Sequence, residues 1–116
     1  MSSKSCRFTR KQRLLNSQDY KYVFEQACKS SDSCLTVLAR KNGLDFARLG
    51  LVISKKQIRH SVARNRVKRL IRESFRNNQQ CLAGLDLVVL AKYRANKVDN
   101  RVLLESLAKH WQSLKL

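Results

Sequence analysis

The 116-residue sequence is poor in acids and in the residues that break a chain. It has no proline and three glycines, so its turns must rest largely on Asn, Asp and Ser. Only 8 Asp and Glu stand against 25 Lys and Arg, which gives a formal net charge of +17. Such a chain attracts polyanions, because neutralised phosphates release their counterions. Nucleic acid is therefore the leading class of partner, with an anionic membrane surface as the alternative.

Long apolar runs are also lacking. No segment approaches the roughly 18 uninterrupted apolar residues of a transmembrane helix, and the start, MSSKSCRFTRKQR, has no apolar stretch like that of a signal peptide. We therefore expect no membrane partner and a cytoplasmic protein. The length fits a single domain over residues 1–116. Residues 1–15 carry five basic side chains and Phe8, and we expect them to form a basic arm.

Residues that build metal and catalytic sites are few or scattered. The four cysteines show no CxxC pair and no nearby histidine cluster, which argues against zinc and favours reduced thiols; they are Cys6, Cys28, Cys34 and Cys81. None of the eight acids has another at i+2, i+3 or i+4, which disfavours a self-sufficient metal nuclease. We predict no catalytic residue and no metal ligand in this chain.

The apolar pattern predicts a helix, then two strands, in the first half of the chain. Ser17 can cap a helix whose apolar positions follow the i, i+3, i+4, i+7 spacing; they are Tyr20, Val23, Phe24 and Ala27. Residues 28–34 form a polar loop in this interpretation. Strands follow at 35–39 and 49–54, and Asn42 and Gly43 between them indicate an antiparallel hairpin.

The second half predicts a helix, a strand and a last helix. The long helix covers residues 61–77, and the strand covers 85–91. Asp99 can cap the last helix, whose expected apolar stripe is Leu104, Leu107, Ala108, Trp111 and Leu114, with Leu103 at its margin. The order helix, strand, strand, helix, strand, helix predicts an α+β two-layer sandwich, with one small sheet packed by helices.

The charge is concentrated at the long helix. Nine basic residues lie between positions 55 and 76, against the single acid Glu73; they are Lys55, Lys56, Arg59, Arg64, Arg66, Lys68, Arg69, Arg72 and Arg76. At about 100° per residue, apolar side chains such as Val67 and Ile71 share one face, whereas Asn65, Arg69 and Arg72 lie opposite. We interpret the outer face as a phosphate-binding surface.

The alternative is a solvated face that only keeps the protein soluble. Such faces usually mix charges to gain i,i+4 pairs worth a few tenths of a kcal/mol. Here Arg64, Lys68 and Arg72 repel one another with little compensation. Arginine outnumbers lysine, which suits bidentate phosphate contacts and stacking on bases. The pattern therefore favours RNA or DNA binding.

The string SKKQIRHSVARNRVKRLIRESFR at residues 54–76 resembles the signature of the bacterial ribonuclease P protein family. The matching positions are Lys55, Lys56, Arg64, Asn65, Arg66, Lys68, Arg69 and Arg72. RLLNSQDYKYVF before this motif, RLGLVIS leading into it and DLVVLAK after it also resemble family segments. The resemblance implies a mixed sheet with a left-handed βαβ crossover, which the usual right-handed rule would not suggest.

The resemblance also implies a mechanism. In that family the RNA subunit uses bound Mg²⁺ to cut the 5′ leader from precursor tRNA, and the protein aids substrate binding and metal affinity. By resemblance, the basic helix contacts the catalytic RNA, and a cleft between the first helix and the sheet takes the single-stranded leader. Tyr20 and Phe24 match the aromatic cleft positions, with Thr36 and Leu38 as further candidates. A place for Tyr20 and Phe24 in the core stays open as the alternative, as does a ribosomal or assembly RNA-binding module for the whole chain.

Overall fold

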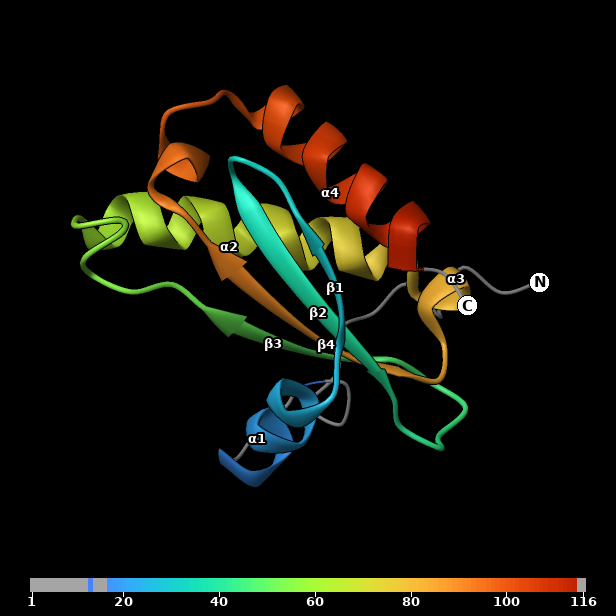
Figure 1. Ribbon diagram of the computed structural model, residues 1–116. Coiled ribbons are helices and arrows are strands. Elements are labelled where there is room, and N and C mark those ends of the chain that lie inside the picture. The colour runs from blue at the N-terminus through green and yellow to red at the C-terminus, as the bar shows by residue number, and fades with distance from the viewer. Residues whose placement is uncertain (1–12, 14–16, 115–116) are drawn as a thin grey trace.

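The computed structural model describes residue 13 and residues 17–114, which form a four-stranded mixed sheet with helices on both faces (Figure 1). The elements are α1 (Ser17–Glu25), β1 (Cys28–Ser31), β2 (Leu35–Lys41), β3 (Arg48–Val52), α2 (Ser61–Arg76), α3 (Gln79–Leu82), β4 (Leu85–Ala91), the 3-10 helix η3 (Tyr93–Asn96) and α4 (Asn100–Leu114). The expected α+β class is confirmed. The basic arm, with Phe8 and Cys6, lies outside the described residues apart from Arg13, which bridges to Leu49. Over the described part of the chain, no helix is long and apolar enough to cross a membrane.

The strands are ordered β1-β2-β4-β3. The hairpin expected between strands 35–39 and 49–54, which are β2 and β3, is therefore wrong, because these strands are not neighbours. β4 lies between β2, to which it runs antiparallel, and β3, to which it runs parallel. The physical reason is the sequence LDLVVLA of β4, which is buried on both faces except for the half-buried Leu90. A strand of that composition belongs in the middle of a sheet. Chain order alone had favoured pairing β2 with β3, which follow one another in the sequence.

The polar loop expected at 28–34 is also wrong in part, because its first half is the edge strand β1. Cys28–Ser31 pairs antiparallel with β2, although most of its side chains are exposed. Backbone hydrogen bonds make this strand, and they leave no apolar pattern in the sequence. The turn after it is made by Asp32, whose Oδ1 accepts the N–H groups of Cys34 at 2.8 Å and Leu35 at 2.9 Å.

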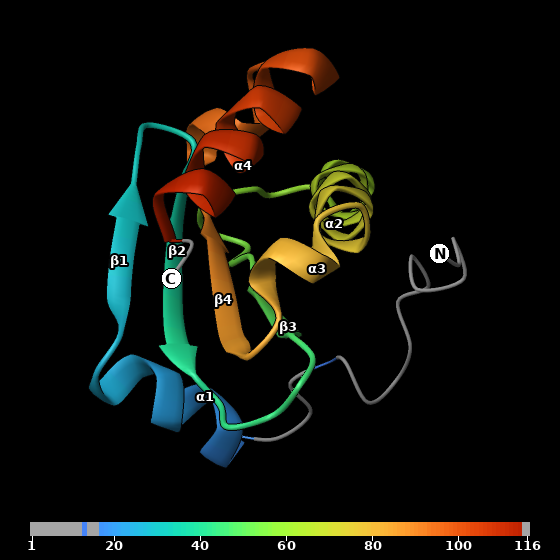
Figure 2. The same ribbon diagram turned by 90° about the vertical axis from the view of Figure 1, so that its right-hand side faces the viewer.

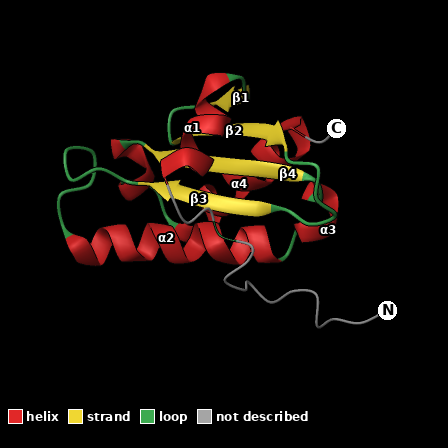
Figure 3. Cartoon of the chain, turned by 90° about the horizontal axis from the view of Figure 1, so that it is seen from below, coloured by secondary structure: helices red, strands yellow, loops and turns green. Residues whose placement is uncertain are grey.

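The β3–α2–β4 connection is a left-handed crossover (Figure 2). In that view the two parallel strands run away from the reader, α2 lies above the sheet, and the chain passes from β3 on the right to β4 on its left. Seen from below the sheet in Figure 3, α2 runs alongside β3 at the side of the sheet away from β1. The long helix therefore turns its outer face away from the rest of the fold.

The main core fills the space between the sheet and the helices α2 and α4. The predicted inner face of α2 is confirmed, since Val67, Ile71 and Phe75 are fully buried. Trp111 is core, as predicted, with 2% of its surface exposed. Its indole Nε1–H donates to Ser74 Oγ at 2.8 Å, and its ring meets Phe75 edge-on with the centroids 6.5 Å apart.

The apolar stripe expected on α4 is rotated in the structure. Leu103 is fully buried rather than marginal, Leu104 is only partly buried and Ala108 is exposed. The polar side chains Ser106 and His110 take the buried positions. They can do so because they are hydrogen-bonded to the β1–β2 region, which sequence periodicity cannot reveal. Asp99 caps the helix as predicted, since its Oδ1 accepts the Val102 N–H at 3.0 Å.

Candidate nucleic-acid interface

Arg64 fixes the start of α2. His60 precedes the helix in an extended conformation and makes no side-chain cap. The Arg64 guanidinium instead donates from Nη1 to the carbonyl oxygens of Ile58 at 3.0 Å and Arg59 at 2.8 Å. Ile58 is itself buried and anchors the loop. A guanidinium has five N–H donors, so Arg64 both orders this loop and keeps donors for a ligand.

Arg66 ties α2 to the segment before α4. Its Nη2 donates to the carbonyl oxygen of Val98 at 2.6 Å, and its Nε donates to Asn100 Oδ1 at 2.9 Å. Two of the residues that the resemblance assigned to RNA therefore also hold the fold together. Nothing in the sequence distinguished this role from RNA contact.

The outer face of α2 carries cations without internal partners. Arg69, Arg72 and Arg76 are exposed and Lys68 is half-buried, and beside them Asn65 is exposed. Within the described residues none of these five side chains makes a hydrogen bond or an ion pair. We call Lys68, Arg69, Arg72 and Arg76 the outer row. Its like charges are unfavourable in the free protein and favourable against phosphates.

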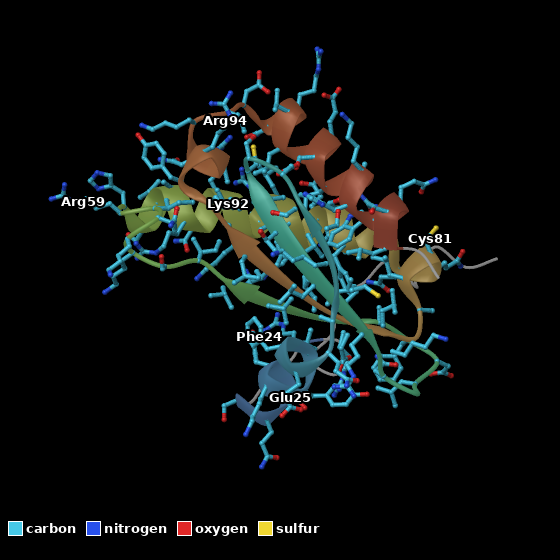
Figure 4. The ribbon with its side chains drawn as sticks, viewed as in Figure 1. Phe24, Glu25, Arg59, Cys81, Lys92 and Arg94 are labelled. Carbon is cyan, nitrogen blue, oxygen red and sulfur yellow. The ribbon has the colours of Figure 1, made fainter. Side chains whose placement is uncertain are left out.

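The loop between β3 and α2 adds three exposed cations at the start of the helix. Lys55, Lys56 and Arg59 flank the buried Ile58. Figure 4 shows the Arg59 side chain pointing away from the protein at that end. The loop cations thus lie just before the start of α2, and the outer row follows on the exposed side of the same helix, toward its end.

The residues predicted to line a leader cleft lie on the other face of the sheet, where α1 packs. Val23 of α1 is fully buried against Val88 of β4. The Tyr20 ring lies next to Gly50 of β3, so close that a Cβ at Gly50 would be 2.7 Å from Tyr20 Cζ. The core alternative therefore describes Tyr20 well, because its ring packs in this small apolar cluster.

Phe24 is placed differently from Tyr20. Phe24 lies in the last turn of α1 (Figure 4), and 48% of its surface is exposed. Thr36 and Leu38 lie on the same sheet face, and both are half-buried. Leu38 packs in the α1 cluster, and Thr36 Oγ1 lies 2.9 Å from Ser31 Oγ. The four predicted cleft residues are thus brought together on one face, with Phe24 the most accessible.

An ion pair that sequence reasoning missed supports this face. Asp86 is completely buried, and both its oxygens accept from Arg48, at 2.8 Å from Nε and 2.7 Å from Nη2. Asn42 Nδ2 donates to the same carboxylate at 2.9 Å. The hydrogen bonds that Arg48 donates to Asp86 raise the pKa of Arg48. A lone Asp in an apolar strand pattern was the only available signal of this pair.

A second polar network joins β1 to α4. Ser106 donates to Asp32 Oδ2 at 2.5 Å, and His110 Nδ1 lies 2.7 Å from Ser30 Oγ. Burial lowers the pKa of His110, and the nearby Asp32 carboxylate only partly opposes this. Burial also acts against ionisation of Asp32, but hydrogen bonds from Ser106 and two backbone N–H groups outweigh it and lower the Asp32 pKa. These groups join β1 to α4 through hydrogen bonds.

Metal-binding side chains do not gather in the described part of the chain. No group of three or more His, Cys, Asp or Glu side chains is placed to hold an ion there. Cys28, Cys34 and Cys81 are free thiols. The carboxylates of Asp32 and Asp86 accept hydrogen bonds from side chains of the protein.

A model of the ribonuclease P family matches residues 8–115. The chain belongs to the ribonuclease P protein family. The ribonuclease P protein component of Methylococcus capsulatus is 55% identical over 104 residues, which cover 90% of this chain and 81% of the relative. That of Aliivibrio fischeri is 47% identical, with 92% of each chain covered.

Solved structures agree with this assignment. The ribonuclease P protein of Thermotoga maritima superimposes with a TM-score of 0.79 at 30% identity, covering 90% of this chain and 98% of that one. The Staphylococcus aureus protein gives a TM-score of 0.81 at 25% identity, with the same coverage. The expected ribonuclease P assignment and fold are confirmed, and with them a subunit role in the 5′ processing of tRNA.

Proposed function

We propose that this ribonuclease P protein binds the RNA subunit through the outer row of α2 and the loop cations, and the 5′ leader of precursor tRNA through the α1 face of the sheet. The RNA subunit performs the hydrolysis in this proposal. The observation that carries it is the outer row, four adjacent cations with no internal partner among the described residues. A surface of this kind gains most from a polyanion.

Arg64 and Arg66 have a double part in the proposal. Their bonds to backbone carbonyls fix the start of α2 and its distance from α4. Their remaining donors lie at the borders of the outer face, where they meet phosphates. Arginine suits this double use because its planar fork is preorganised and always charged. Asn65 lies between them as a neutral donor and acceptor.

The leader contact is supported by the exposure of Phe24. An aromatic face stacks on unpaired bases without demanding a sequence, at about 1 to 3 kcal/mol per base. Thr36 and Leu38 add half-buried side chains on the same face of the sheet. Tyr20 contributes by holding α1 against Gly50, so that it positions Phe24 rather than stacking itself.

Magnesium enters the proposal through the RNA. The acids of the protein that lie near other polar groups are engaged internally, and we assign no Mg²⁺ ligand to the described residues. The chain affects the metal requirement through its charge: cations on α2 neutralise RNA phosphates, so fewer Mg²⁺ ions are needed to fold the RNA and hold the substrate.

The salt dependence of RNA binding tests the proposal. Each phosphate contact contributes about 0.7 to 0.9 to the slope of log affinity against log salt concentration. The variant Arg69→Ala/Arg72→Ala/Arg76→Ala should therefore lower that slope for the ribonuclease P RNA by about 2 to 3. At 0.15 M salt it should also weaken binding on the order of a hundredfold.

A cation on another helix supplies the control. Arg101 on α4 is highly exposed, and its ion pair with Glu105, at 3.7 Å, is a weak surface pair. Arg101→Ala should leave the slope unchanged. A fall in slope for Arg101→Ala about one third as large as that of the triple variant, which is the same fall per charge removed, would mean that only net charge matters and would contradict the proposal. Equal affinity of the wild-type protein for ribosomal RNA at the same salt would favour a general RNA-binding module instead.

A further inference from the structure

At the carboxyl ends of β3 and β4, further cations from the segment after β4 join the loop cations. The two strands are parallel neighbours, so the segments that follow them, 53–60 and 92–97, emerge at the same end of the sheet. Neither segment contains an acid. Figure 4 shows Arg59, Lys92 and Arg94 at this end. We call its exposed cations the strand-end surface: Lys55, Lys56, Arg59, Arg94 and Lys97.

Tyr93 lies in the middle of this surface and is held there with its ring exposed. It has 57% of its surface accessible although its backbone is fixed. The Tyr93 N–H donates to Gln57 Oε1 at 2.7 Å, which joins the two segments. Ala95 in the next turn is fully buried and anchors η3. The Lys97 ammonium lies 5.0 Å from the Tyr93 ring centroid.

The part of the strand-end surface formed by η3 is firmly attached to α2. η3 contacts α2 directly, and Arg66 of α2 bonds to Val98 and Asn100 just after η3. α1, which carries Phe24, packs on the opposite face of the sheet from α2 (Figure 1). An RNA that lies along α2 therefore reaches Tyr93 by continuing past the start of the helix, whereas a strand bound on the α1 face of the sheet lies on the other side.

We propose that Tyr93 stacks on an unpaired base of the RNA subunit and that Arg94 and Lys97 bind the flanking phosphates. This rests on the proposed function of α2 and extends its RNA contact to η3. An exposed aromatic ring between cations has the two features of single-strand recognition, since the ring takes any base and the cations follow the backbone. The Lys97 ammonium, now at the ring, is free to move to a phosphate, because it makes no ion pair among the described residues.

Affinity for the ribonuclease P RNA, measured without substrate over a range of salt concentrations, tests this inference. Tyr93→Ala should weaken binding by about fivefold to a hundredfold without changing the salt slope, because no charge is lost. Tyr93→Phe should bind like the wild type. Arg94→Ala/Lys97→Ala should lower the slope by about 1 to 2. Tyr22→Ala is the matched control. Tyr22 is an exposed tyrosine of α1 whose ring lies under the Arg40 guanidinium, and its loss should leave the affinity for the RNA unchanged.

The outcomes separate this inference from the proposed function. Normal RNA affinity of a folded Tyr93→Ala variant, with unfolding followed by circular dichroism, would overturn the stacking contact and leave the α2 interface standing. A loss confined to the affinity difference between precursor and mature tRNA would also overturn it, because that difference reports the leader. Failure of the wild-type protein to prefer the ribonuclease P RNA would instead overturn the proposed function.

Discussion

Replacing Gly50 with alanine should loosen α1 from the sheet. The added methyl group would lie 2.7 Å from Tyr20 Cζ and 2.8 Å from Tyr20 Cε2, well inside the 3.5 to 4.0 Å of a normal carbon contact. The Tyr20 ring must therefore shift away from Gly50, which disturbs the packing of α1 on the sheet. Overpacking of this kind costs about 1 to 3 kcal/mol in the free energy of unfolding.

A double-mutant cycle isolates the cause. Gly50 has no positive φ, so alanine there is otherwise neutral or stabilising by about 0.5 kcal/mol. In a Tyr20→Ala background the clash is gone, and Gly50→Ala should change from destabilising to neutral or slightly stabilising. The interaction energy between the two positions should thus be at least about 1 kcal/mol.

Urea unfolding of the four proteins measures this energy, and tRNA binding gives its functional consequence. Because α1 carries Phe24, Gly50→Ala should reduce the preference of the reconstituted enzyme for precursor tRNA over mature tRNA. Additive effects of the two substitutions on stability would refute the reasoning, since they would show that Tyr20 and Gly50 do not touch. An unchanged leader preference would separate α1 packing from leader binding.

Two further perturbations test the polar groups that support the fold. Asp86→Asn should cost about 3 kcal/mol in urea unfolding, because it breaks a buried pair and leaves Arg48 without its carboxylate; a loss below about 1 kcal/mol would contradict that assignment. Stability should fall as the pH drops below about 6.5, because the unfolded state protonates His110 while burial keeps its folded pKa lower. His110→Gln should make the free energy of unfolding less dependent on pH between pH 5 and 7. An identical dependence in both proteins would show that His110 is not its source.

The basic helix and the core were accessible to sequence reasoning because their signals are periodic. Val67, Ile71 and Phe75 recur on one helical face, and the cations lie on the other, so both the buried and the exposed side of α2 follow from spacing alone. Trp111 was predicted as core for the same reason. The family resemblance added the crossover, which no local pattern encodes.

The errors arose where backbone hydrogen bonds or distant side chains decide the structure. β1 was missed because backbone pairing with β2 holds it in the sheet, so its side chains need no apolar pattern. The position of β4 between β2 and β3 depends on burial of both its faces, which competes with chain order. Ser106 and His110 enter the interior only because Asp32 and Ser30 meet them there. The structural bonds of Arg64 and Arg66 were hidden for the same reason, since their carbonyl partners carry no sequence signal.

Cleavage of precursor tRNA by the reconstituted enzyme at low Mg²⁺ tests the central claim most directly, that the outer row of α2 holds the catalytic RNA. The wild-type protein should stimulate cleavage by its RNA subunit, and Arg69→Ala/Arg72→Ala/Arg76→Ala should lose most of that stimulation at limiting protein and regain it at high protein concentration. Arg101→Ala should match the wild type. Full stimulation by the triple variant at limiting protein, or cleavage by the purified protein without RNA, would contradict the account.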